Sequence, residues 1–242
     1  MSITVGDNSR HGRSIMTVDV VVIVAAHNEA DRIASTLRAL ADGFPGAPVW
    51  VADDGSSDGT GEIAAQAGAN VVRSERTIGK GQAMTLAVGS VLGAPGIGKT
   101  STVLLCDGDL GESAALLGPL ADAVQAGEVD LAVAAFARRV GGGIGLAVGF
   151  ARWAIRRRCG LELRAPISGQ RAMRAGLLEG MLPLAAGFGM EIGMTIDASR
   201  AGARVRELDL DLHHRATGRT LGGFLHRGRQ LVDFVRVYRS RR

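Results

Sequence analysis

The sequence predicts an α/β fold with a mostly parallel central sheet flanked by helices. Short runs of β-branched and other apolar residues alternate with amphipathic segments of helical length over the first 136 residues. The apolar runs are continuous, which is typical of strands covered by helices on both faces. Hydrophobic residues make up 46% of the chain and charged residues 21%, so a folded domain is expected and a mainly disordered chain is excluded.

The first half of the chain repeats a strand followed by a helix. Val18 to Ala26 is a continuous β-branched run, and the segment after it carries Ile33, Leu37 and Leu40 at helical spacing. Strands that alternate with helices at such spacing form parallel sheets with right-handed crossovers. The expected strands are 18–26, 49–52, 70–73, 102–106 and 130–136, and the expected helices are 29–41, 58–67, 81–92 and 113–126.

The second half is less regular but still consists of helices and strands. Its expected elements are a helix over 141–158, a loop with a short strand over 164–173, a helix over 191–201, an alternating strand over 204–212 and an arginine-rich helix over 221–238. Gly202 follows the expected helix over 191–201, at the position where glycine commonly ends a helix. Residues 1–17 are polar and aperiodic, so we expect a flexible tail followed by one domain over 18–242.

Polar and acidic residues follow three of the expected strands. In parallel sheets the carboxyl ends of the strands meet at one edge, where ligands bind. Acidic groups there would repel a phosphate ligand unless a divalent cation lay between, and their hard oxygens suit Mg²⁺ or Mn²⁺. Taken alone, Asp-Gly-Asp is also a common turn sequence. The residues are Asn28 and Glu29 after the first strand, Asp53 and Asp54 after the second, and Asp107 and Asp109 after the fourth.

Four sequence runs in this half resemble a known family. The runs VVVIVAAHNEADRI, VWVADDGSSDGT, GKGQAM and VLLCDGDL are similar to those of the family 2 glycosyltransferases, which have the GT-A fold. The resemblance covers about residues 18–238 and departs from the family where Ala25 replaces a proline. It implies a hexosyltransferase that takes a sugar from a UDP- or GDP-linked donor with the help of Mg²⁺ or Mn²⁺. Residues 18–136 would then form the nucleotide-sugar half and 137–242 the acceptor half.

The resemblance also implies roles for single residues in the first half. Ala26 and Glu29 would line the nucleoside pocket, Asp54 would contact the base, and Lys80 would lie where family members hold the nucleotide. Asp107 would meet the ribose or the metal, and Asp109 would bind the metal and serve catalysis. Asn28 and Asp53 belong to the same strand ends and complete the expected donor site.

The runs SGQRAMR, GFGMEIG and LHHRATGR in the second half are similar to those of glucosyl-3-phosphoglycerate synthases and polyprenyl-phosphate glycosyltransferases. By this resemblance Ser168, Gln170 and Arg171 would lie near the acceptor, and His214, rather than His213, would be a third metal ligand. Glu191 is expected as a general base or as a group that orients the acceptor. The alternatives kept open are a surface histidine pair and a glutamate that only complements the helix dipole.

Positive charge gathers at the end of the chain. Residues 213–242 contain eight arginines and one aspartate, although the whole chain carries a net charge of only +4. Because a guanidinium group pairs well with phosphate, we expect Arg215 and Arg219 to bind an anionic acceptor, either a small phosphorylated acid or a polyprenyl phosphate. Sparse aromatic residues in this segment argue against nucleic acid.

The sequence shows no signal for secretion or for insertion into a membrane. We expect a cytoplasmic protein, since no secretory signal and no apolar run of spanning length is visible, with peripheral membrane contact and a homodimer left open. The alternatives to a glycosyltransferase are a sugar-nucleotide pyrophosphorylase and a non-catalytic membrane-surface binding protein.

Gly93 to Thr100 matches the phosphate-loop pattern, but a helix precedes it and a strand follows, the reverse of what that motif needs.

Overall fold

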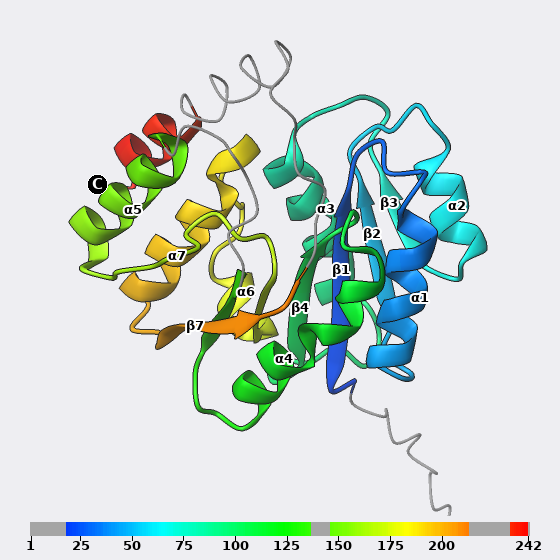
Figure 1. Cartoon of the computed structure of the whole chain (residues 1–242), viewed down its shortest axis with the longest axis horizontal. Helices are drawn as coiled ribbons and strands as arrows, with labels where there is room; N and C mark the ends of the chain where they lie inside the picture. The colour runs from blue at the N-terminus through cyan, green and yellow to red at the C-terminus, as the bar shows by residue number, and fades with distance from the viewer. Residues whose placement is uncertain (1–17, 137–145, 213–232, 242) are drawn as a thin grey trace, which may run out of the picture.

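The computed structural model describes residues 18–136, 146–212 and 233–241, and these form a seven-stranded sheet covered by helices on both faces (Figure 1). The strand order is β3-β2-β1-β4-β6-β5-β7. The strands are β1 (Val20–Ala26), β2 (Val49–Asp53), β3 (Asn70–Arg73), β4 (Thr102–Asp107), β5 (Leu131–Phe136), β6 (Arg171–Arg174) and β7 (Val205–Leu210). Pairing is parallel except for β6, which is antiparallel to both β4 and β5. The predicted mostly parallel α/β sheet is thereby confirmed.

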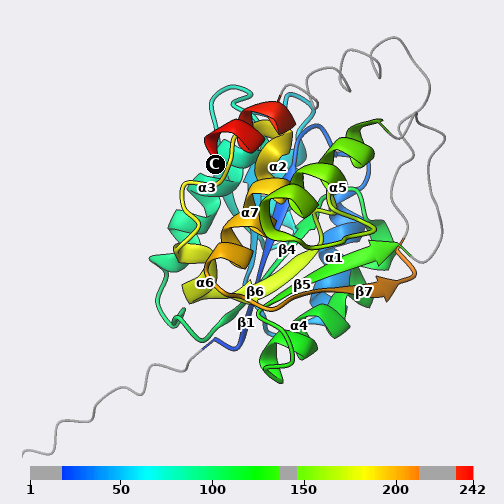
Figure 2. The same ribbon diagram turned by 90° about the vertical axis from the view of Figure 1, so that its left-hand side faces the viewer.

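Two layers of helices bury the two faces of the sheet, as Figure 2 shows from the side. Residues of α1, η1 and α4 pack on one face, and residues of α3, α6 and α7 pack on the other. Outside α7, a third apolar cluster joins it to α5 and to the helix at 233–240. The helices are α1 (Ile33–Gly43), α2 (Thr60–Gln66), α3 (Lys80–Leu92), η1 (Gly111–Leu117), α4 (Gly118–Gln125), α5 (Leu146–Cys159), α6 (Ala175–Glu179), η2 (Gly187–Gly189) and α7 (Met190–Arg200).

Two predicted helices differ from the structure for local reasons. The first begins at Ile33 instead of residue 29, because the backbone of Arg32 has a φ of −128°, outside the range of an α-helix, and residues 30–32 form a turn. The predicted helix over 113–126 is a 3₁₀ helix followed by α4. Pro119 stands at the start of α4, and it lacks the N–H that a continuous α-helix would need there.

The sequence did not predict η2 or the short helix α6, and the expected loop over 164–173 ends in the antiparallel strand β6. The N-terminal tail and the first part of the expected helix over 221–238 lie outside the described residues. Within the described ranges, no helix is long and apolar enough to cross a membrane.

Candidate active site

The ends of three neighbouring strands lie level with one another at one edge of the sheet. Ala26 pairs with Asp53 across β1 and β2, and Ala25 pairs with Asp107 across β1 and β4. The chain register therefore places the predicted acidic groups at the carboxyl ends of adjacent strands, as expected for a ligand site in a parallel sheet.

The turn after β4 is held by a residue that the sequence analysis missed. Thr36 of α1 is fully buried, and its hydroxyl donates to the carbonyl of Gly108 over 2.8 Å and accepts from the N–H of Gly111 over 2.9 Å. The N–H of Gly108 also donates to the carbonyl of Ala25. These bonds fix the backbone between Asp107 and Asp109. The signal in the sequence that could have identified Thr36 is its position as a single hydroxyl residue on the apolar face of the predicted helix.

Lys80 joins two carboxylates that come from distant parts of the chain. Its Nζ lies 2.6 Å from Oδ1 of Asp107 at the end of β4 and 2.8 Å from Oε1 of Glu191 in the first turn of α7. Burial lowers the pKa of Lys80, but attraction by Asp107 and Glu191 outweighs it and raises the pKa above its ordinary value. Lys80 therefore stays charged at neutral pH, and three residues predicted for the site are in contact.

The second oxygen of Asp107 is held by the segment before β6. Gln170 Nε2 donates to Asp107 Oδ2 over 2.8 Å, and Ser168 Oγ donates to Gln170 Oε1 over 2.9 Å. Both side chains were predicted to lie near the acceptor. They are almost completely buried, with 6% of Ser168 and 1% of Gln170 exposed, and they contact the Asp107 side of the site instead.

Arg171, which was predicted to bind the acceptor, lies in the core. It is fully buried, and its guanidinium donates to the carbonyls of Ser168 and Pro166 and to the hydroxyl of Thr195. Burial lowers the pKa of Arg171 to about 10, against the opposing attraction of Glu191, so the group remains charged at neutral pH. In this structure Arg171 holds the loop before β6.

Asp53 and Asp54 both hold backbone around the site. Asp53, which was predicted for the donor site, is fully buried, accepts from the N–H of Ser56, and lies 3.4 Å from Arg73 Nε, so it closes the turn after β2. The carboxylate of Asp54 accepts from the N–H groups of Ile78 and Gly79 and thus anchors the segment that leads into Lys80.

The loop after β1 is bonded to the loop after β2. Asn28 is exposed and has a positive φ of 55°, and its side-chain oxygen accepts from the N–H of Ser57. The N–H of Asn28 donates to Ser56 Oγ, and the N–H of Glu29 donates to Thr60 Oγ1. The ends of β1 and β2 are thus bound together, with Ala26 buried at the base of the loop.

Asp107 and Asp109 have the donor chemistry of a divalent-cation site. Both carboxylates are partly exposed, and they flank the fixed backbone of Gly108 at the sheet edge. Among the residues that the structure describes, no group of three or more His, Cys, Asp or Glu side chains is placed to hold a metal ion. The predicted third ligand, His214, and the predicted phosphate-binding residues Arg215 and Arg219 lie outside the described residues.

The segment that carries Glu191 is packed under the helix at 233–240. A Cβ on Gly187 would lie 2.1 Å from Asp233 Oδ2, and one on Gly189 would lie 2.2 Å from Val237 Cγ2, so only glycine fits at either position. Arg241 forms an ion pair with Asp197 of α7. This arginine of the basic C-terminus therefore fixes α7 and does not face a ligand.

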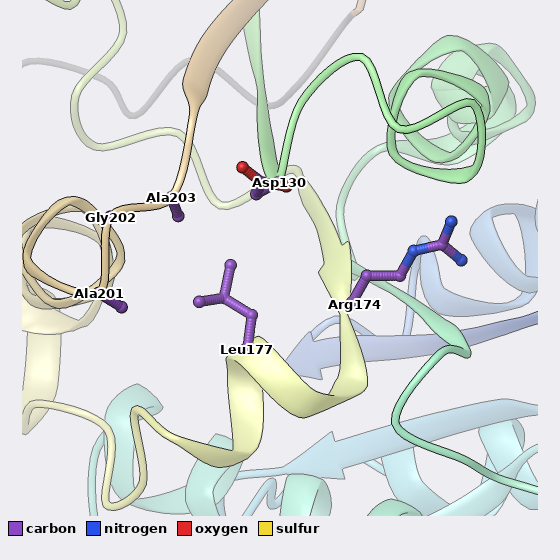
Figure 3. A pocket seen from close by; sticks show the side chains of 6 residues that line it. All are labelled: Asp130, Arg174, Leu177, Ala201, Gly202 and Ala203. Atoms are coloured by element: carbon purple, nitrogen blue, oxygen red, sulfur yellow. The ribbon is translucent and has the colours of Figure 1, made fainter.

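Two other features do not form sites. The phosphate-loop pattern lies between α3 and β4, in the helix-to-strand connection that the sequence predicted. Figure 3 shows a hollow of about 270 Å³ near Leu177, at the edge of the sheet where the parallel strands begin. Its charged side chains are already bonded, Arg174 to carbonyls of Thr100 and Val124, and Asp130 to Arg204.

The fold and the site define a GT-A glycosyltransferase. The sheet order, the acidic strand ends and the charged junction at Lys80 agree with this class, and comparisons with known proteins identify the family. Residues 21–158 match the family model described as glycosyl transferase family 2, which is more than half of the chain. The chain belongs to glycosyl transferase family 2. This decides for glycosyl transfer over the nucleotidyl-transfer and non-catalytic alternatives.

Individual relatives support the same assignment. Glycosyltransferase AglJ of Haloferax volcanii is 32% identical over 211 residues, which cover 82% of this chain and 64% of AglJ, so the chain spans about two thirds of that relative's length. A structure of glucosyl-3-phosphoglycerate synthase from Mycobacterium tuberculosis with Mn²⁺, UDP and glucosyl-3-phosphoglycerate has a TM-score of 0.71 and 27% identity, covering 92% of this chain and 79% of that one. Its complex with phosphoglyceric acid gives a TM-score of 0.73 at the same identity and coverage.

Proposed function

We propose that this glycosyltransferase moves a hexose from a UDP- or GDP-linked donor to a phosphate-bearing acceptor with the help of Mg²⁺ or Mn²⁺. The observation that carries the proposal is the junction at Lys80, where a charged ammonium group meets Asp107 and Glu191 at the strand ends. Structures of a relative with 27% identity hold Mn²⁺ and UDP with a phosphorylated product, which supports the same chemistry here.

The donor would bind over the ends of β1, β2 and β4. Ala26, Asn28 and Glu29 would line the nucleoside part of the pocket, and Asp54 would shape it through the backbone at Ile78 and Gly79. Lys80 would face the diphosphate, because its ammonium group is fixed beside Asp107 at the start of α3. A cation there stabilises the negative charge that develops on the leaving diphosphate.

Asp107 and Asp109 would hold the divalent cation, with His214 as the predicted third ligand. Bound there, the cation would supply further positive charge to the leaving nucleoside diphosphate. The remaining work falls to the protein's own groups. As the acceptor oxygen bonds to the anomeric carbon, the bond from that carbon to the diphosphate breaks, and Glu191 would orient the acceptor or take its proton.

Positive charge after β7 favours a phosphate-bearing acceptor. Arg215 and Arg219 follow β7, and β7 is parallel to β5, so the chain leaves it at the same edge of the sheet as the other parallel strands. A neutral acceptor would not need guanidinium groups there, whereas phosphate pairs with them bidentately. Structures of the relative with phosphoglyceric acid support a small phosphorylated acid as one source of that phosphate.

A lipid phosphate is the other source, and one surface favours peripheral membrane contact. Trp153 of α5 is half exposed and packs at a tilt against Tyr238 of the 233–240 helix, with 4.8 Å between the ring centroids. Phe150 joins the same cluster, and Arg156 and Arg157 are exposed beside it on α5. Aromatic residues with arginines are typical of surfaces that rest on anionic headgroups.

Release of nucleoside diphosphate tests the proposal. The chain is incubated with Mn²⁺ and UDP- or GDP-hexoses, together with either 3-phosphoglycerate or polyprenyl phosphate in vesicles. We expect acceptor-dependent release of UDP or GDP with one of the two acceptors, and its loss in Asp109→Ala with the fold retained. Pyrophosphate release from a sugar phosphate and a nucleoside triphosphate, or turnover by Asp109→Ala at the wild-type rate, would contradict the proposal.

A further inference from the structure

Ser168 and Gln170 form a short relay of hydrogen bonds that ends on Asp107. Gln170 donates to Asp107 Oδ2 over 2.8 Å, and Ser168 donates to Gln170 Oε1 over 2.9 Å. Only 1% of Gln170 and 6% of Ser168 is exposed. Neither side chain presents a surface to a ligand, so both can affect ligand binding only through their contact with Asp107.

The Asp107 carboxylate sets the direction of the relay. A glutamine amide has a donor end and an acceptor end of nearly the same shape, and only the donor end can bind a carboxylate. Gln170 therefore turns its nitrogen toward Asp107, and the Ser168 hydroxyl donates to the oxygen at the other end of the amide. Without that hydroxyl, the buried oxygen of Gln170 would lose its donor, which is unfavourable.

The loop that carries the relay is built against the carboxylate. A Cβ on Gly169 would lie 2.6 and 2.7 Å from the two oxygens of Asp107, so the backbone itself packs on this group. The buried guanidinium of Arg171 donates to the carbonyls of Ser168 and Pro166, which fixes the loop from behind. With Lys80 on Oδ1, both oxygens of Asp107 are held by donors from different elements.

We propose that Ser168 and Gln170 are positioning residues that fix the orientation of the Asp107 carboxylate for the donor, and that they do not contact the acceptor. This rests on the proposed function in one respect, that Asp107 belongs to the donor site. Loss of a partner behind a ligand-binding group typically weakens binding about 10- to 100-fold.

Four variants of the full chain test the relay. Gln170→Met keeps the size of the side chain but removes the donor, and we expect donor affinity with Mn²⁺ to fall about tenfold while the acceptor KM stays unchanged. Ser168→Ala should cause a smaller loss, and Ser168→Thr, which restores a hydroxyl, should recover wild-type affinity. Because Ser168 acts through Gln170, the double variant Ser168→Ala/Gln170→Met should lose no more than Gln170→Met alone.

Ser101→Ala is the matched control, since it also removes a buried, hydrogen-bonded hydroxyl but lies at the opposite end of β4. It should lower the melting temperature without changing donor affinity. A raised acceptor KM with unchanged donor affinity in Gln170→Met would restore the acceptor role and overturn the relay. Additive losses in the double variant would overturn it as well.

A crystal structure of Gln170→Met provides a readout that does not need the proposed function. A changed Asp107 side-chain orientation supports the relay even if the chain binds no nucleotide sugar, in which case the proposed function alone fails. An Asp107 carboxylate that keeps the wild-type orientation without the Gln170 amide would overturn the relay even if the chain is an active glycosyltransferase.

Discussion

Lys80 and Asp54 show how single side chains organise the donor site from opposite ends of one segment. Asp54 binds the backbone N–H groups of Ile78 and Gly79, and Lys80, the next residue, reaches Asp107 and Glu191. The two residues thus connect the end of β2 to the end of β4 and to the start of α7. Changes at either residue should affect donor binding, but for different reasons.

Replacing Lys80 removes the cation between two carboxylates. In Lys80→Met, Glu191 keeps a nearly buried charge without its partner, which typically costs about 3–5 kcal/mol when a buried pair is broken. We expect a clearly lower free energy of unfolding in urea and loss of donor binding. Lys99→Met is the matched control, because Lys99 is the chain's other lysine, is exposed, and should be replaceable without either effect. Wild-type stability of Lys80→Met would contradict the observed geometry.

Replacing Asp54 frees the segment before Lys80. Asp54→Ala removes bonds from a carboxylate to two backbone N–H groups, and hydrogen bonds to charged groups contribute about 1.5–3 kcal/mol each. Donor affinity should fall even in metal-free buffer, since the effect passes through backbone and not through the cation. Isothermal titration with UDP and GDP in the presence of a chelator measures this, and an unchanged affinity would remove Asp54 from the site.

The residue types at the strand ends were readable from the sequence, whereas their partners were not. Glu191, Lys80 and Asp107 were each predicted for the site, and the structure brings them into contact. The sequence could not tell which carboxylates face a ligand. Asp53 and Arg171 are fully buried, which the sequence did not indicate, because burial depends on how distant segments pack, and a charged residue beside a motif has the same sequence signal whether it faces in or out.

At the scale of elements, the site depends on how closely α3 packs against the segment before α7. Gly81, the residue after Lys80, lies so near Ala185 that a Cβ would come within 1.9 Å of its carbonyl oxygen. This close approach keeps the start of α3, and so Lys80, within reach of Glu191. The contact joins the first half of the chain to the second at the site.

Two glycines in the same helix should respond in opposite directions to alanine. Gly81→Ala forces backbone apart, and overpacking of this kind costs about 1–3 kcal/mol, so the melting temperature and donor affinity should both fall. Gly89→Ala is the matched control, since nothing lies within 4 Å of its added Cβ, and it should stabilise the helix by about 0.5–1 kcal/mol. Thermal unfolding distinguishes them, and equal melting temperatures would contradict the close packing.

The order of strands and helices followed from hydrophobic periodicity, and a short strand was expected within 164–173. Its antiparallel direction and its place in the middle of the sheet were not predicted. Arg171 to Arg174 is short and carries arginines at both ends, so its pattern does not show where in a sheet it lies. That place, between β4 and β5, is set by pairing with Val103 and Ala132, which are far away in the sequence.

In the whole molecule, the proposed donor site lies at the strand ends of the first half, and the arginine-rich segment 213–242 belongs to the second half. The helix at 233–240 packs on the segment that holds Glu191, and Arg241 is bound to Asp197. Arginines elsewhere in the C-terminal segment remain the predicted acceptor-binding groups.

Loss of those arginines should affect the acceptor and spare the donor. In Arg215→Ala and Arg219→Ala, one charge-assisted contact to the acceptor phosphate is lost, which costs about 1.5–3 kcal/mol, or roughly ten- to hundredfold in kcat/KM for the acceptor. Steady-state kinetics at saturating donor, with Arg204→Ala as a control far from the strand ends, measures the effect. Normal turnover of a phosphorylated acceptor by both variants would show that the charge serves another purpose.

We propose that the edge formed by Asp107, Asp109 and Lys80 binds a nucleotide sugar together with a divalent cation. Calorimetric titration of the full chain with UDP- and GDP-hexoses, with and without Mn²⁺, tests this binding. We expect saturable binding of one of these donors that Mn²⁺ strengthens, and loss of the Mn²⁺ effect in Asp109→Ala. Absence of binding to any donor, or binding that is equally strong without Mn²⁺ and in Asp109→Ala, would contradict it.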